Sequence, residues 1–219
     1  LVGESGCGKS TVGRSLIRLV EPTSGDVNLD GQNILSLNPN DMREARRNIQ
    51  MVFQDPFASL NPQMMLVDQV AEPLRNYGAV KREVLQEKIG DLFDRVKLPR
   101  SFMQRYPHEL SGGQRQRIAI ARALALNPKL IIADEAVSAL DVSVQAQVLN
   151  LLKQLQREFE LTYLFITHDL AVLSTMANKI GVLKKGRLIE EQASERLFSR
   201  PGHYHTKMLL SAAPSLTIE

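Results

Sequence analysis

A stretch near the start of the chain has residue types and a spacing suited to binding phosphate. Residues 3–10, Gly-Glu-Ser-Gly-Cys-Gly-Lys-Ser, fit the pattern GxxxxGKS at every fixed position. Glycines at this spacing let the backbone amides form a concave nest for anionic oxygens, where a Cβ would obstruct the approach. The apolar spacing that follows predicts a helix from Lys9 to about Val20, whose positive N-terminal end faces the same anion.

The polar side chains of this loop predict that it binds a nucleotide through its phosphates, together with Mg²⁺. Lys9 is expected to reach the β- and γ-phosphates, and the Ser10 hydroxyl to ligate Mg²⁺. Because only Leu1 and Val2 precede the loop, we expect the preceding strands of the sheet to be absent, and the residue that stacks on adenine is left open. The other predicted nucleotide-binding residues of the loop are Gly3, Glu4, Ser5, Gly6, Cys7, Gly8 and Thr11.

Composition narrows the class of protein. Among 219 residues, 43% are hydrophobic and 23% charged, as in ordinary globular proteins. The net charge of +3 is small and Lys and Arg lie among acidic residues, so no nucleic-acid partner is expected. The single cysteine, Cys7, excludes an internal disulfide and indicates a reducing compartment. No apolar stretch is long enough to cross a bilayer, so a membrane role is expected to be peripheral.

Strand and helix patterns alternate along the chain, which predicts an α/β fold with a doubly wound, mainly parallel sheet. We interpret residues 1–219 as a single domain with a helical subdomain at 64–112 and a tail at 193–219. The expected helices are 39–47, several within 66–105, one from Ser111 to before Pro128, one after Asp141 to 159, and a short one after Asp169. The expected strands are 49–53, 130–134 and 163–167, with hairpins at 27–34 and 180–189.

Polar residues follow three of these strands, and ligands of open α/β sheets bind beyond the C-terminal strand ends. Asp134 suits a carboxylate that holds Mg²⁺ indirectly, through a bound water, and Glu135 suits a group that orients and polarises the attacking water. His168 is expected to contact the γ-phosphate and hold Glu135 in place, and Gln54 to sense the metal and the water. The plainer alternatives are structural: a strand-end Asp or Gln can cap a turn, and a single His is often structural.

A second candidate anion site lies in Leu110-Ser111-Gly112-Gly113-Gln114. Ser111 is expected to cap a helix, and the amides after it point at an anion. One chain cannot easily bring this segment to its own phosphate loop. The alternative is that the segment is only a helix cap.

These motifs, in this order, resemble the nucleotide-binding subunit of an ABC transporter. The resemblance implies that two such domains pair head to tail, as a homodimer or with a paralogue, and that each ATP lies between the phosphate loop of one and the Leu-Ser-Gly-Gly-Gln segment of the other. It also places Gln114 and Asp141 at the nucleotide. The residues that carry it are 3–10, Gln54, 110–114, 130–135, 138–141 and His168.

Finer features are similar to bacterial importers of oligopeptides, dipeptides, nickel or glutathione. They are residues 54–62, residues 134–145 and the tail around 205–210. This resemblance implies ATP hydrolysis that powers import of peptides or a related small solute, at the cytoplasmic face of the bacterial inner membrane. The implied partners are integral permease subunits and, indirectly, a solute-binding protein. The transported solute is left open, because selectivity in this class lies in those other subunits.

Two points keep alternatives open. His203 and His205 stand where relatives place Pro-Tyr-Thr, and we interpret them as solvated tail residues rather than a metal site, because two histidines alone make a poor site. The alternative functions are an ABC-type ATPase without membrane subunits, such as a carbon–phosphorus lyase accessory protein, and an inactive fragment that lacks its N-terminal part.

Overall fold

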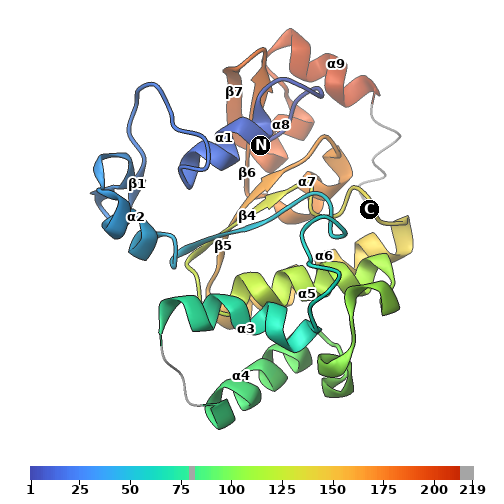
Figure 1. Cartoon of the computed structure of the whole chain (residues 1–219). Coiled ribbons are helices and arrows are strands. Elements are labelled where there is room, and N and C mark those ends of the chain that lie inside the picture. The colour runs from blue at the N-terminus through green and yellow to red at the C-terminus, as the bar shows by residue number, and fades with distance from the viewer. Residues whose placement is uncertain (79–81, 213–219) are drawn as a thin grey trace. The chain divides into compact units, whose positions relative to one another are not determined.

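The computed structural model describes residues 1–78 and 82–212, and its contacts divide the chain into two compact units. Unit 1 comprises residues 1–36 and 164–219, and unit 2 comprises residues 37–163. The division into one domain with a helical subdomain at 64–112 and a tail at 193–219 stays a prediction. Figure 1 shows the elements, which in chain order are α1 (Lys9–Leu16), β1 (Asn28–Leu29), β2 (Gln32–Asn33), η1 (Ile34–Ser36), α2 (Pro39–Ala45), β3 (Ile49–Val52), α3 (Leu66–Tyr77), α4 (Arg82–Arg95), η2 (Arg100–Gln104), η3 (Pro107–Glu109), α5 (Gly112–Leu124), β4 (Leu130–Asp134), α6 (Val142–Phe159), β5 (Thr162–Ile166), α7 (Leu170–Met176), β6 (Lys179–Lys184), β7 (Arg187–Ala193), α8 (Ser194–Ser199) and α9 (Tyr204–Ala212).

In unit 1 the first two residues act as a strand. Val2 forms parallel bridges to Thr167, just after β5, and to Val182 in β6. Its N–H donates to Gly181 O at 2.9 Å, and Leu183 N–H donates to its carbonyl at 2.7 Å. Strands β6 and β7 form the predicted antiparallel hairpin. The phosphate loop therefore starts from the middle of a hydrogen-bonded sheet.

Helix α1 is shorter than predicted, ending at Leu16 rather than near Val20. Arg18 adopts φ 51°, and its N–H bonds to Ser15 O while Leu19 N–H bonds to Arg14 O. This is the Schellman arrangement that ends a helix, which usually has glycine at the left-handed position. Because Arg18 stands there, the sequence carried no stop signal. Leu19, which lies beyond the end of the helix, is 55% exposed.

In unit 2 the strands β3 and β4 agree with the prediction. They run parallel, with Ile49 opposite Leu130 and Val52 opposite Ala133. Ile131 and Ile132 of β4 are fully buried, as expected of a strand covered on both faces. The predicted α/β fold, a parallel sheet flanked by helices, is confirmed.

The helices of unit 2 bury an aliphatic core. Helix α3 packs on α5 and α4, and α5 packs on β3 and α6. Phe93 of α4 is fully buried, whereas Val84 of the same helix is 57% exposed. Residues 79–81 of the predicted helical stretch lie outside the described residues.

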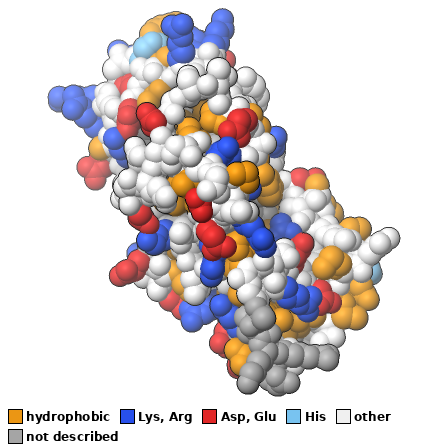
Figure 2. Space-filling view, turned by 60° about the vertical axis from the view of Figure 1, so that its left-hand side comes forward, with side chains coloured by type: hydrophobic (Ala, Val, Ile, Leu, Met, Phe, Trp, Pro, Cys, Tyr) orange, Lys and Arg blue, Asp and Glu red, His pale blue; other side chains and the backbone are white. Residues whose placement is uncertain are grey.

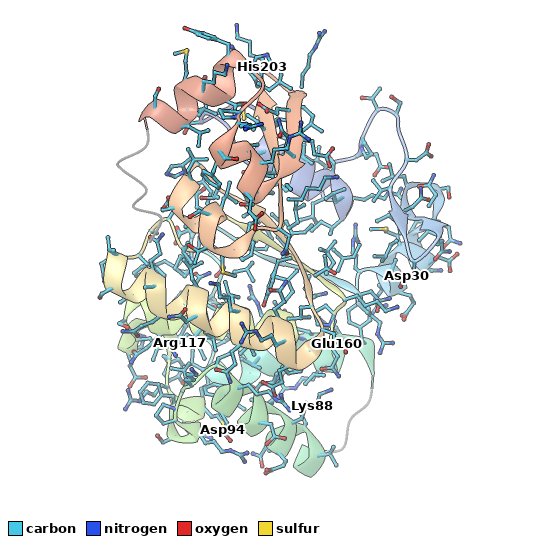
Figure 3. The ribbon with its side chains drawn as sticks, turned by 180° about the vertical axis from the view of Figure 1, so that it is seen from behind. Asp30, Lys88, Asp94, Arg117, Glu160 and His203 are labelled. Carbon is cyan, nitrogen blue, oxygen red and sulfur yellow. The ribbon has the colours of Figure 1, made fainter. Side chains whose placement is uncertain are left out.

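Charged side chains on the surface of unit 2 link η2 to α4. Arg100 of η2 donates to Glu87, Asp91 and Asp94 of α4 at 2.9, 2.7 and 2.8 Å. A Cβ on Gly90 would lie 2.7 Å from the Arg100 guanidinium, so glycine there lets the arginine lie across the helix. Figure 3 labels Asp94 on this surface, and on the face shown in Figure 2 basic and acidic side chains are interspersed.

No helix within residues 1–78 and 82–212 combines the length and the apolar character needed to cross a membrane.

Replacing Phe93 with alanine should lower the free energy of unfolding by about 3–5 kcal/mol, because the ring is fully buried and leaves a cavity. The control Val84→Ala, on the exposed side of the same helix, should change it by less than about 0.5 kcal/mol. Urea denaturation followed by circular dichroism measures both. Equal losses in the two variants would contradict the core described here.

Candidate functional site

The phosphate loop in unit 1 closes around its own lysine. Lys9 is only 5% exposed, and its Nζ donates to Gly3 O at 2.8 Å and to Glu4 O at 2.9 Å. A buried ammonium is costly unless it is hydrogen-bonded, so these two carbonyls hold the loop and the lysine together. The Nζ group is thereby oriented at the start of α1, where the helix dipole also favours an anion.

The glycines of the loop serve two different purposes. Gly6 and Gly8 have φ 75° and 102°, a region that L side chains rarely adopt. Gly3 instead meets a packing limit, because a Cβ there would collide with Leu183 O and lie 2.7 Å from Cys7 Sγ. The sequence pattern correctly predicted glycine at all three positions. The structure shows that backbone conformation requires it at Gly6 and Gly8, and lack of space at Gly3.

Cys7 is an internal residue of the loop. Its side chain is buried and its Sγ lies 3.9 Å from Lys9 Nζ. Its carbonyl accepts the Gly186 N–H at 2.9 Å, so the β6–β7 turn anchors the loop. Of the neighbouring loop residues, Ser5 and Thr11 are exposed and Ser10 is half-buried in the first turn of α1.

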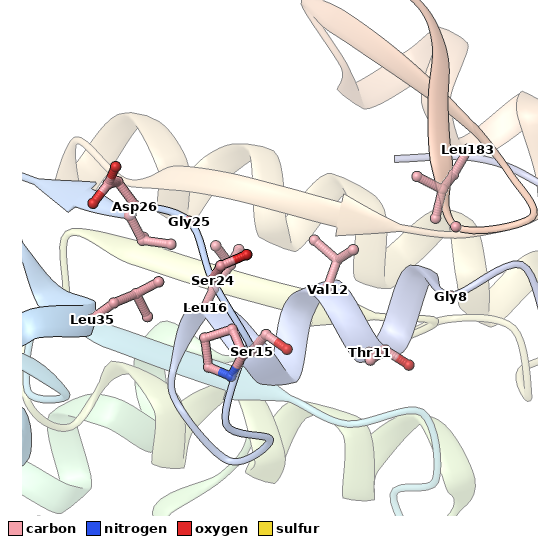
Figure 4. A pocket seen from close by; sticks show the side chains of 13 residues that line it. Gly8, Thr11, Val12, Ser15, Leu16, Ser24, Gly25, Asp26, Leu35 and Leu183 are labelled. Atoms are coloured by element: carbon pink, nitrogen blue, oxygen red, sulfur yellow. The ribbon is translucent and has the colours of Figure 1, made fainter.

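A hollow of about 350 Å³ lies beside α1 and reaches the phosphate loop at Gly8 and Thr11 (Figure 4). Aliphatic and small polar side chains line it. The residue that would stack on adenine stays unassigned, because no lining residue is aromatic. The remaining lining residues are Val12, Ser15, Leu16, Pro22, Ser24, Gly25, Asp26, Val27, Leu35, Leu183 and Gly186.

In unit 2 the structure brings Gln54 and Glu135 together, although 81 positions separate them in the chain. Gln54 Nε2 donates to Glu135 Oε2 at 2.8 Å. Glu135 has φ 48°, a strained conformation for a residue other than glycine, and Ser138 donates to its carbonyl through its N–H at 3.1 Å and its hydroxyl at 2.9 Å. Such strain persists where surrounding contacts impose it, often at functional sites. Asp134, the residue before it, is 2% exposed at the end of β4.

The Leu-Ser-Gly-Gly-Gln segment forms the predicted cap of α5. Ser111 Oγ accepts the Gln114 N–H at 3.4 Å, and Gln114 Oε1 accepts the Ser111 N–H at 3.0 Å, which is a capping box. A Cβ on Gly113 would collide with Val144 Cγ1 of α6, whereas one on Gly112 would meet only Leu140 Cδ2 at 3.6 Å. Gly113 therefore allows α5 and α6 to pack closely.

The two remaining predicted site residues are Asp141 and His168. Asp141 caps α6, and hydrogen bonds from the Val144 N–H and the Ser143 hydroxyl lower the pKa of its carboxyl. His168 is exposed and lies in unit 1, directly before Asp169, which caps α7. Glu135 lies in unit 2, so the predicted support of Glu135 by His168 stays a prediction.

Sequence reasoning missed two arginines of α5 that hold the loop after β3. The guanidinium of Arg115 lies 3.7 Å from the ring centroid of Phe57, and its Nε donates to Pro107 O at 2.7 Å. Arg122 donates to Ser59 O at 2.7 Å, and burial lowers its pKa. Their contacts are tertiary, so the helical spacing of α5 could not reveal them.

The interpretation of the tail histidines needs a correction. His203 is exposed, at the start of α9 (Figure 3), but His205 is 4% exposed and so is not a solvated residue. It is buried because Glu190 of β7 binds the backbone of Gly202 and His203 and folds the tail onto the hairpin. Among residues 1–78 and 82–212, no cluster of three or more His, Cys, Asp or Glu suits a metal ion.

Comparison with known proteins now identifies the family. Residues 1–138 match the family described as ABC transporter, which is more than half of the chain. The chain belongs to the ABC transporter family. This agrees with the paired features above, a phosphate loop in unit 1 and a capped Ser-Gly-Gly helix in unit 2.

Curated relatives of this ABC family chain are longer than it is. The oligopeptide transport ATP-binding protein AppF of Bacillus subtilis (strain 168) is 54% identical over 215 residues, which is 98% of this chain and 65% of that protein. The glutathione import ATP-binding protein GsiA of Pectobacterium atrosepticum is 50% identical over 214 residues, 98% of this chain and 34% of that protein. The chain thus spans less than two thirds of either relative.

Solved structures support the same assignment. The cbiO1 protein of Clostridium perfringens, part of the ABC transporter complex cbiONQ, matches with TM-score 0.82 and 27% identity, covering 91% of this chain and 78% of that one. The ATP-binding cassette MJ0796, a dimer in a post-hydrolysis state bound to ADP and Pi, matches with TM-score 0.78 and 35% identity, covering 88% and 83%.

The collision at Gly113 gives a matched pair of variants. Gly113→Ala should lower the free energy of unfolding by about 1–3 kcal/mol, because the new methyl group must displace Val144. Gly112→Ala, one residue earlier in the same helix, should change it by less than about 1 kcal/mol. Chemical denaturation of each variant measures this.

A second substitution tests whether the collision with Val144 causes the loss of stability in Gly113→Ala. Adding Val144→Ala to Gly113→Ala should recover part of the loss, because the two sites are in contact and should not be additive. Equal stability of the two glycine variants would show that α5 does not depend on this close approach.

Proposed function

We propose that the chain is an ATP-binding and ATP-hydrolysing unit that powers import of peptides or a related small solute. The observation that carries the proposal is the Gln54–Glu135 contact at 2.8 Å, in a chain whose phosphate loop is built around Lys9. A carboxylate oriented by an amide suits a group that positions water, and the loop suits the anion that the water attacks. The relatives AppF and GsiA are named for oligopeptide transport and glutathione import.

The residues of the loop would hold the phosphates of ATP, with Lys9 at the β- and γ-phosphates. The donor chemistry also fits Mg²⁺, since Ser10 offers a hydroxyl, Gln54 an amide oxygen and Asp134 a carboxylate, which are the oxygen ligands this ion prefers. When bound, Mg²⁺ supplies charge neutralisation at the phosphates. The hollow beside Gly8 and Thr11 leaves room for the nucleoside.

The proposed reaction is transfer of the γ-phosphoryl group to water. The water oxygen forms a bond to the γ-phosphorus as the bond to the β,γ-bridging oxygen breaks, giving ADP and phosphate. Glu135 would orient and polarise that water, with its own carboxylate held by Gln54. Lys9 would stabilise the negative charge on the phosphates, and we assign His168 to contact the γ-phosphate.

We infer that a second nucleotide-binding domain completes the pocket, as a homodimer or with a paralogue. The amides of Gly112 and Gly113 stand at the N-terminal end of the 13-residue helix α5, where anions are favoured. The related cassette MJ0796 is described as dimeric. In the proposed arrangement the Ser111 segment of one domain faces the phosphate loop of the other, with Gln114 and Asp141 nearby.

We infer further that the domain works at the cytoplasmic face of the bacterial inner membrane, with permease subunits and, indirectly, a solute-binding protein. The loop after β3 offers a contact for a permease helix, because Phe57 is 62% exposed yet held by Arg115. The alternative of an ABC-type ATPase without membrane subunits, such as a carbon–phosphorus lyase accessory protein, has no support from the names of these relatives. Co-purification with integral membrane subunits separates the two.

Glu135→Gln should keep ATP binding and abolish steady-state hydrolysis, because the amide still pairs with Gln54 but cannot polarise water. The hydrolysis rate is expected to fall by roughly 100-fold or more. Filter binding of labelled ATP and a phosphate-release assay measure the two properties. Glu195→Gln, an exposed carboxylate in α8, is the matched control and should behave as wild type.

Normal turnover in Glu135→Gln would remove the role assigned to Glu135. An N-terminally longer chain should be assayed beside the present one, because hydrolysis by the longer chain alone would support the alternative that these 219 residues are an inactive fragment.

A further inference from the structure

The segment that leads into α9 is tied to β7 through one carboxylate. Glu190 accepts the N–H groups of Gly202 at 2.7 Å and His203 at 3.0 Å. Burial raises the pKa of Glu190, but hydrogen bonds from the Gly202 and His203 N–H groups and the Gln192 amide outweigh it and hold the pKa below its usual range. The segment is therefore fixed on the hairpin, and the hairpin turn in addition binds the phosphate loop through Gly186.

This anchoring places His205 beside the phosphate loop. His203 Nδ1 accepts the N–H of His205 at 3.0 Å, which fixes the first turn of α9. The His205 side chain is buried, and its Nε2 atom makes no hydrogen bond within the described residues. Glu4 Oε1, in the phosphate loop, lies 3.9 Å from that atom.

A buried donor without a hydrogen-bond partner is unfavourable, and at 3.9 Å the Glu4 carboxylate is too far from His205 Nε2 to accept a hydrogen bond. The Glu4 side chain is 66% exposed and can move at little cost. A shift of about 1 Å toward the histidine reaches the length of a charge-assisted hydrogen bond.

We propose that His205 is a positioning residue for the phosphate loop, whose Nε2–H donates to the Glu4 carboxylate and thereby couples the C-terminal segment to nucleotide binding. The inference rests on the proposed ATP-binding function and goes beyond it, because it assigns a role in that binding to a residue 196 positions from Lys9 in the sequence.

The coupling passes through the backbone of Glu4. Its carbonyl accepts Lys9 Nζ at 2.9 Å and the Cys7 N–H at 3.3 Å. Fixing Glu4 by its side chain limits the movement of this carbonyl and so of the lysine that meets the phosphates. Without His205, more of the ordering of the loop must come from the binding energy of the nucleotide, and affinity falls.

A double-mutant cycle on ATP affinity, measured by calorimetry, tests this coupling. His205→Phe keeps the volume of the ring but removes the donor, and it should weaken ATP binding roughly threefold to tenfold. In a Glu4→Ala background the same substitution should change the affinity by less than about twofold. His205→Gln, which restores a donor, should bind ATP more tightly than His205→Phe. Tyr204→Ala, 73% exposed on the same helix, is the control and should match wild type.

The outcomes separate this inference from the function on which it rests. If wild-type protein binds ATP but His205→Phe weakens binding equally with and without Glu4, or not at all, the positioning role is overturned and the proposed function stands. If wild-type protein binds no ATP, both are overturned. Thermal unfolding checks that each variant is folded, and His205→Leu takes the place of His205→Phe in the cycle if the phenylalanine variant is not.

Discussion

The buried ammonium group of Lys9 is the constraint on which the rest of unit 1 depends. It is stable at 5% exposure only because the carbonyls of Gly3 and Glu4 turn inward to accept from it. That turn requires the positive φ of Gly6 and Gly8, and it requires a firm base, which Val2 supplies between Thr167 and Val182. The same backbone conformation thus serves the fold and the anion site, because it hydrogen-bonds the lysine and leaves amide groups available for phosphate.

In unit 2, packing and hydrogen bonds hold polar groups in fixed positions. Glu135 sits in a left-handed conformation at the end of β4, and Gln54 and Ser138 hold it there. The same unit packs the capped Ser111 helix against α6 so closely that Gly113 admits no side chain. Both features use packing energy to keep polar groups in position before any ligand arrives, which is how phosphoryl-transfer sites lower their barrier.

Local signals were read well from the sequence. The structure agrees with the predicted phosphate loop, the Ser111 cap, the helix after Asp141 and the strand 130–134. Each of these depends on residues that are near one another in the sequence. The predictions that failed depend either on contacts between residues far apart in the chain or on a position that lacks its usual residue type. Helix α1 ends early at Arg18, where glycine would have signalled the stop.

The error at His205 has a tertiary origin. Nothing local marks His205 as buried, because the carboxylate that folds the tail inward, Glu190, comes from a strand 15 positions earlier. The Gln54–Glu135 contact and the hold of Arg115 and Arg122 on the loop after β3 also span long separations in the chain, and so they emerge only from the fold.

The most direct test of the account is the affinity of the chain for MgATP with and without the Lys9 ammonium group. Calorimetry should show that wild-type protein binds ATP and that Lys9→Met, which keeps the length of the side chain, binds it roughly 100-fold more weakly or not at all. Lys129→Met, an exposed lysine elsewhere, should bind as wild type. Equal affinity in Lys9→Met and wild type would contradict a loop built around this lysine to hold phosphate.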